Sequence, residues 1–138
     1  MREIRFRAWD KDKKRMIYLA NNMGSQTHLQ LNNHSWGVFE PDSEDYYGIA
    51  SANSNLGDIL MQYTGLKDKN GNEIYEGDIV KCDYFTGIVE YRENAGLYLI
   101  GNEKEGKAIT FFDIQMSKAI VEVIGNIYEN PELLEGRE

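Results

Sequence analysis

Turn sequences recur at short intervals through the second half of the chain, and this spacing limits the fold more than any other feature. Asn70-Gly71 favours a type I′ hairpin turn, because both central residues of that turn need positive φ. Residues 76–78 (Glu-Gly-Asp) and 93–96 (Glu-Asn-Ala-Gly) are also typical of tight turns. The apolar segments between these turns are short, which favours strands over helices.

Alternation of apolar and polar residues indicates antiparallel strands. Residues 4–9 alternate Ile, Phe and Ala with Arg, Arg and Trp, and residues 16–19 return as a second strand after a charged turn. One helical turn is expected at 131–135, with Asn130 as N-cap and Pro131 at the first helical position. The pattern predicts a mainly β fold, a small antiparallel barrel or roll. Further strands are predicted at 59–63 (alternatively a short turn of helix), 78–84, 87–91, 97–100, 108–112 and 119–128.

The length of 138 residues suits a single domain spanning 1–138. Residues 20–57 differ in character, since Asn, Ser and Gly interrupt only short apolar pieces. We interpret this stretch as a variable excursion, with one short hairpin inside it, because a long structureless loop is uncommon in a compact domain.

The charge is unevenly distributed. The chain carries 23 acidic and 15 basic residues, a formal charge of −8, which argues against a general nucleic-acid binder working by bulk positive charge. Residues 1–20 nevertheless carry a local balance of +4, which leaves −12 for the other 118. Such asymmetry can mark a partner surface or a self-complementary contact, and it is equally explained by a solvated basic hairpin on an acidic protein.

A basic strand face is the candidate contact site. Arg5, Arg7 and Trp9 would share one exposed face of the first strand, opposite Ile4, Phe6 and Ala8. Such a face could grip a nucleic-acid backbone and stack on a base, or it could dock an acidic surface of a second copy. The same residues serve both hypotheses, so the sequence does not separate them. The complete candidate set is Arg5, Arg7, Trp9, Lys11, Lys13, Lys14 and Arg15.

No catalytic, cofactor or metal site is predicted. The single cysteine, Cys82, removes a disulfide framework and a cysteine zinc site, and we expect it to be a buried, inert thiol. His28 and His34 lie near several acids, but their spacing fits no recognised metal site. Residues 68–73 resemble a calcium loop only faintly, and the Asn-Gly turn explains them better. No apolar run is long enough to span a membrane and no signal peptide is evident, so we expect a soluble cytoplasmic protein.

Three separated blocks resemble the YopX family, a group of phage and prophage proteins from Gram-positive bacteria. They are residues 4–10 (IRFRAWD), 60–80 (LMQYTGLKDKNG followed, after Asn72, by EIYEGDIV) and 123–134 (VIGNIYENPELL). The resemblance covers the first 20 residues and most of 59–134. It implies an SH3-like β roll that can self-associate, has no established activity and offers no catalytic residues to carry over.

Turn chemistry alone accounts for the glycines in these blocks. Gly65, Gly71 and Gly77 lie where turns can require positive φ, and Gly125 would allow a bulge or a tight corner. We therefore expect a non-enzymatic phage or prophage accessory protein that acts through protein contacts and self-association, with a second copy or a host or phage protein as partner. The alternative is a weak single-stranded nucleic-acid binder that uses the N-terminal hairpin.

Overall fold

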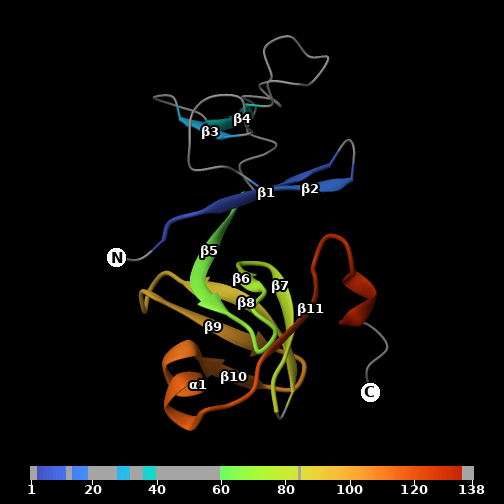
Figure 1. Ribbon diagram of the computed structural model, residues 1–138. Helices are drawn as coiled ribbons and strands as arrows, with labels where there is room; N and C mark the ends of the chain where they lie inside the picture. Colours follow the sequence, from blue (N-terminus) through green and yellow to red (C-terminus); the bar gives the residue numbers. More distant parts are fainter. Residues whose placement is uncertain are drawn as a thin grey trace. The chain divides into compact units, whose positions relative to one another are not determined.

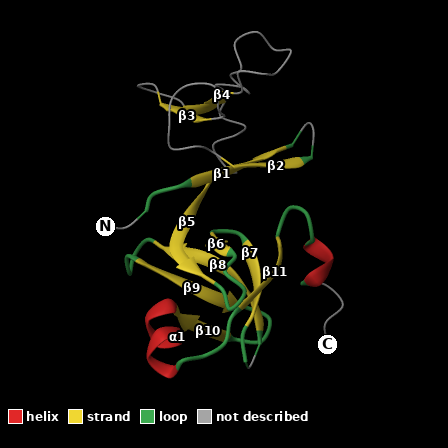
Figure 2. Ribbon diagram, in the orientation of Figure 1, coloured by secondary structure: helices red, strands yellow, loops and turns green. Residues whose placement is uncertain are grey.

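The computed structural model describes residues 3–11, 14–18, 28–31, 36–39, 60–83 and 85–134 (Figure 1). The chain divides into two compact units, Met1–Gln62 and Tyr63–Glu138. Antiparallel strands dominate the described residues (Figure 2), so the predicted mainly β, barrel-like fold is confirmed.

The first unit is built on an antiparallel hairpin at the N-terminus, as predicted. Strand β1 (Phe6–Asp10) pairs with β2 (Arg15–Tyr18), and residues 60–62 of β5 (Leu60–Lys67) pair with the other edge of β1. Strands β3 (His28–Leu31) and β4 (Trp36–Phe39) form a second hairpin. The short hairpin expected inside 20–57 is thereby confirmed, and the rest of that excursion lies outside the described residues.

The second unit is a five-stranded antiparallel sheet in the order β10-β9-β8-β7-β11. In addition, the end of β5 pairs with β6 around a register shift between Tyr63 and Lys67. The remaining elements of this unit are β6 (Glu73–Tyr75), β7 (Asp78–Lys81), β8 (Thr86–Arg92), β9 (Leu97–Asn102), β10 (Lys107–Thr110), α1 (Phe111–Ser117), β11 (Glu122–Asn126) and the 3-10 helix η2 (Pro131–Leu133).

Helix α1 corrects the sequence prediction of a strand over 108–112. Strand β10 ends at Thr110, whose side-chain oxygen accepts a 3.1 Å hydrogen bond from the Asp113 amide and so caps the helix. Phe111 and Ile114, three residues apart, are buried on one side of the helix. The helix ends at Ser117, and the C-cap residue Lys118 adopts the left-handed conformation with φ of 54°. The apolar run that suggested a strand therefore contains a change from period two to helical spacing.

Two further strand predictions need shortening. The strand predicted at 119–128 covers only Glu122–Asn126, because residues 119–121 form no regular secondary structure and residues 127–129 form a turn. The strand predicted at 78–84 ends at Lys81, and Tyr84 lies outside the described residues. The bulge expected at Gly125 is confirmed by a register shift between Val123 and Gly125.

The turn at Asn70-Gly71 is tight but is not type I′. Gly71 has positive φ, as do Gly65 and Gly77, so those three predictions are confirmed, but Asn70 is not among the described residues with positive φ. The Gly71 amide donates to the Asp68 carbonyl at 3.0 Å, and the Asp68 amide donates to the Asn72 carbonyl at 2.8 Å. The Asp68 side chain accepts hydrogen bonds from backbone amides of this loop, which favours a conformation other than type I′.

The Asp68 carboxylate is the centre of this loop. It is buried, and its Oδ1 accepts hydrogen bonds from the amides of Asn70 (2.9 Å) and Asn72 (2.8 Å). Its Oδ2 accepts from the Asn72 side chain at 3.2 Å and from the Val123 amide, 55 positions away, at 2.9 Å. Burial by itself raises the pKa of Asp68, but the hydrogen bonds outweigh it and hold that pKa below its ordinary value. One side chain thus joins the β5–β6 loop to β11.

The chain after β11 is fixed by two asparagines. The Asn126 side-chain oxygen accepts from the amides of Tyr128 (3.0 Å) and Glu129 (2.9 Å). Asn130 takes the N-cap position of η2, with Pro131 first in the helix as predicted, but its side chain does not cap. It accepts instead from the Asn126 amide at 3.3 Å, which holds η2 against the end of β11.

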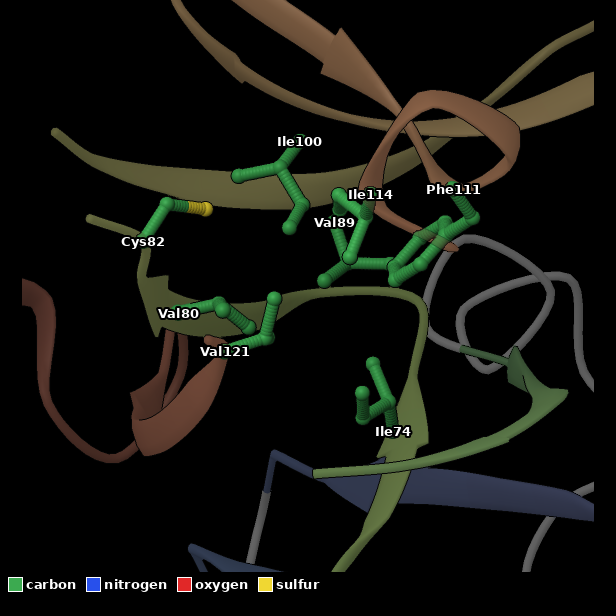
Figure 3. Close-up of a cluster of buried hydrophobic side chains, with 8 residues drawn as sticks. All are labelled: Ile74, Val80, Cys82, Val89, Ile100, Phe111, Ile114 and Val121. Atoms are coloured by element: carbon green, nitrogen blue, oxygen red, sulfur yellow. The ribbon is translucent and has the colours of Figure 1, made fainter. Parts of the chain in front are cut away.

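The core of the second unit forms between the sheet and α1. Helix α1 contacts β9 and β10, and the side chains of Phe111 and Ile114 point into a buried apolar cluster (Figure 3). Ile100 and Val89 are almost fully buried there, which makes them large contributors to the hydrophobic stabilisation. The full cluster is Ile74, Val80, Cys82, Val89, Ile100, Phe111, Ile114 and Val121.

Replacing Gly125 by alanine tests the packing of η2. An added Cβ would lie 2.6 Å from the Asn130 Oδ1 and 2.8 Å from the Leu133 Cδ1. We expect Gly125→Ala to lower the free energy of unfolding by about 1–3 kcal/mol in urea titrations. Gly101→Ala is the matched control, because the side-chain atoms nearest to its Cβ, on Leu99 (3.3 Å) and Glu90 (3.4 Å), would lie farther away. Equal losses in both variants would contradict the packing described.

Replacing Asp68 by asparagine tests the carboxylate tie. In Asp68→Asn an NH₂ group would replace one carboxylate oxygen and would face hydrogen-bond donors. We therefore expect this variant to lower the free energy of unfolding by about 1–3 kcal/mol at pH 7. The folded-state pKa lies below the unfolded one, so this contribution is complete above the unfolded pKa and is lost as pH falls through the folded value. The difference between wild type and variant should therefore shrink below about pH 4. Asp113→Asn, at an exposed position of α1, is the control, and a similar loss there would contradict the assignment.

Candidate functional site

The N-terminal hairpin does not present the expected basic and aromatic face. Arg7 is 3% exposed and Trp9 is 9% exposed, whereas Ile4, expected on the inner face, is 54% exposed. Strand β1 lies between β2 and β5 in its sheet, and the three consecutive residues 7–9 are all buried. Both faces of β1 are therefore covered, and the expectation that Arg7 and Trp9 are exposed is wrong.

The other members of the candidate set lie nearer to solvent. Arg5 is half-buried and forms an ion pair with Glu3, with 2.5 Å between nitrogen and oxygen. Arg15 is exposed and pairs with Asp10 at 3.6 Å. Lys11 and Lys14 are exposed, and Lys13 lies outside the described residues. A contact role for Lys11, Lys14 and Arg15, which we name the hairpin tip, stays a prediction.

The histidines offer no metal site that the structure describes. The backbone of His28 belongs to β3, and His34 falls outside the described residues. Among the described residues, no three His, Cys, Asp or Glu side chains come together in a way that could hold a metal ion.

Cys82 is a buried free thiol, as predicted. Burial is the main cause that raises the pKa of Cys82 to about 11, and the negative charge of Asp83 adds to it. Figure 3 shows its sulfur pointing inward among the core side chains. A thiol with so little thiolate is a poor nucleophile.

A groove in the second unit brings together residues that the sequence did not connect. Its volume is about 610 Å³, and it lies along β8 and β9, with the β7–β8 turn, the β9–β10 turn and the C-terminal end of η2 around it. Its apolar lining comes from Phe85, Ile88, Leu133 and Leu134. Its charged lining consists of four acidic residues, Asp83, Glu90, Glu103 and Glu105, and two basic residues, Lys81 and Lys104.

Asn102 fixes one side of the groove. Its side-chain nitrogen donates to the Thr86 carbonyl at 2.8 Å, which ties the end of β9 to the start of β8. Its side-chain oxygen accepts from the Glu105 amide at 3.1 Å, which shapes the β9–β10 turn. The carboxylates of that turn are therefore carried on an ordered piece of backbone. Sequence reasoning missed this site because its lining comes from three separate segments, within residues 81–90, 101–105 and 133–134, and only the strand alternation of Ile88 and Glu90 gave a local signal.

These features define a small antiparallel β protein with a groove on one unit. The chain belongs to the YopX family, described as YopX protein, because the model of that family matches residues 5–135. The YopX protein from Bacillus subtilis is 22% identical over the full length of both chains, with a TM-score of 0.64, and shares the fold. Protein EF1440 from Enterococcus faecalis is 26% identical over 98% of this chain and all of its own, with a TM-score of 0.49. No curated protein matches the chain.

The helices in the described part of the chain, α1 and η2, are short. Neither of them is both long enough and apolar enough to cross a membrane.

The state of Cys82 gives a direct chemical prediction. With a pKa of about 11, only about one thiol in a thousand is ionised at pH 8. We expect the folded protein to react with Ellman's reagent far more slowly than the protein unfolded in guanidinium chloride, in which the single cysteine reacts completely. Comparable rates in the two states would show that the thiol is accessible and reactive.

Proposed function

We propose that this chain is a non-enzymatic accessory protein of a phage or prophage that acts in the host cytoplasm through protein contacts, including contacts with a second copy of itself. The observation that carries the proposal is an exposed apolar surface on and after α1. Phe112 is 69% exposed, Met116 is 70% exposed and Ile120 is 56% exposed. We name these three residues the α1 patch.

The α1 patch is unlike scattered surface hydrophobics. Phe112 and Met116 are four residues apart in a helix, so they lie on the same side of it. Phe111 and Ile114 hold the opposite side of the helix in the core, which keeps the outward pair in place. Grouped exposed apolar side chains on a soluble protein commonly mark an interaction site.

A second copy is the partner that best fits the α1 patch. A twofold contact requires a surface that complements itself, and an antiparallel pair of α1 helices places Phe112 of one copy toward the C-terminal end of the patch on the other. The exposed acid Asp113 lies near the start of the patch and the exposed base Lys118 near its end. The same pairing brings opposite charges together at both ends, which favours this arrangement over a parallel one.

The nucleic-acid alternative has less support. It required a basic strand face with an aromatic ring available for stacking, and Arg7 and Trp9 are both buried. The overall charge of −8 also opposes binding to phosphate. We therefore do not propose it as the function.

Charge placed on the α1 patch tests self-association. We expect wild type to form a dimer in size-exclusion chromatography with light scattering, and Met116→Glu to shift it to monomer without loss of fold, because Met116 is exposed. Gln115→Glu adds the same charge at an exposed neighbour outside the patch and should leave the dimer intact. A monomeric wild type at all concentrations, or a dimer indifferent to Met116→Glu, would overturn the assignment.

Salt separates this contact from one made by the hairpin tip. An apolar contact should persist at high salt, whereas a contact through Lys11 and Lys14 should weaken. If the dimer dissociates in salt and in a Lys11→Glu, Lys14→Glu variant but not in Met116→Glu, the hairpin tip and not α1 is the interface.

A further inference from the structure

We propose that the groove along β8 and β9 binds an extended peptide segment of a partner protein that carries Arg or Lys beside apolar residues. This site is separate from the α1 patch, and every residue that lines it belongs to the second unit. A volume of about 610 Å³ falls within the range of pockets that enclose a ligand, and it suits a short segment of chain.

The charge of the lining selects a cationic ligand. Four carboxylates and two ammonium groups line the groove, which leaves an excess of two negative charges. Glu90 pairs with Arg92 at 2.5 Å, which reduces the excess to one negative charge, and the Glu105 Oε2 accepts a 3.4 Å hydrogen bond from the Asn102 side chain. We therefore expect the other two carboxylates, Asp83 and Glu103, to attract a ligand cation. The field of such a groove favours Arg or Lys and disfavours acidic segments.

The apolar lining favours a ligand that carries apolar surface next to its cation. Phe85 and Ile88 contribute apolar surface from the β7–β8 connection and β8, and Leu133 and Leu134 contribute it from the end of η2 and the residue after it. The methylene stems of Arg and Lys, and an apolar residue next to them, can cover such surface while the charged head stays near the carboxylates. A ligand with both properties fits better than a free cation.

The groove is built to stay open. At Gly101 an added Cβ would approach the Glu90 Oε1 at 3.4 Å, so the absence of a side chain there leaves room beside Glu90. Asn102 holds the adjoining turn through its bonds to Thr86 and Glu105. An ordered wall reduces the entropy lost when a ligand binds, which favours binding of a flexible peptide.

The experiment uses the full chain and a fluorescein-labelled hexapeptide, Leu-Arg-Leu-Arg-Leu-Arg, with anisotropy as the readout. We expect saturable binding that weakens with salt, and no binding of the matched acidic peptide Leu-Glu-Leu-Glu-Leu-Glu. Glu103→Lys should weaken binding about tenfold, whereas Glu93→Lys, the same charge change in the exposed β8–β9 turn, should change it less than about twofold.

Three further measurements test whether the peptide binds in the groove itself. Gly101→Val should fill the space beside Glu90 and weaken binding. Met116→Glu should bind as wild type, because the site does not depend on self-association. In ¹H–¹⁵N spectra the peptide should shift the amides of Ile88, Asn102 and Glu103. No saturable binding, equal effects of the two charge reversals, equal binding of hexa-arginine, or shifts confined to the β1–β2 hairpin would each overturn the proposal.

Discussion

The buried Asp68 carboxylate is the interaction on which the second unit most depends. It accepts from three donors of its own loop, on Asn70 and Asn72, and from a fourth, the Val123 amide in β11. An unpaired carboxylate would be costly to bury, so the loop and β11 stabilise each other through it. Because β11 also positions η2 through Asn126 and Asn130, the same tie supports Leu133 and Leu134, which line the groove.

Local chemistry made much of this fold predictable. The positive φ of Gly65, Gly71 and Gly77, the bulge at Gly125 and the place of Pro131 each follow from one residue and its neighbours. Helix α1 was missed because Ile109, Phe111 and Phe112 read as a strand, although Thr110 followed three positions later by Asp113 is a helix-capping signal. The burial of Arg7 and Trp9 was missed because alternation shows which residues share a face and does not show whether that face is exposed.

The candidate sites were less predictable than the fold. The groove depends on pairings between β7, β8 and β9 and on the return of the chain after β11, none of which is a local property. The α1 patch became visible only once the segment was known to be a helix with its other side in the core. The blocks that identify the YopX family account for turns and ties in the fold, whereas the proposed contacts use residues mostly outside those blocks.

An ionised Asp68, whose Oδ2 accepts a hydrogen bond from the Val123 amide, holds β11 in place. The most direct measurement is an NMR pH titration of the Asp68 side-chain carboxyl carbon together with the Val123 amide proton. The account predicts a carboxyl midpoint below the ordinary value for aspartate, and a Val123 amide that shifts with the same midpoint. A midpoint at or above the ordinary value, or a Val123 amide indifferent to the titration, would contradict it.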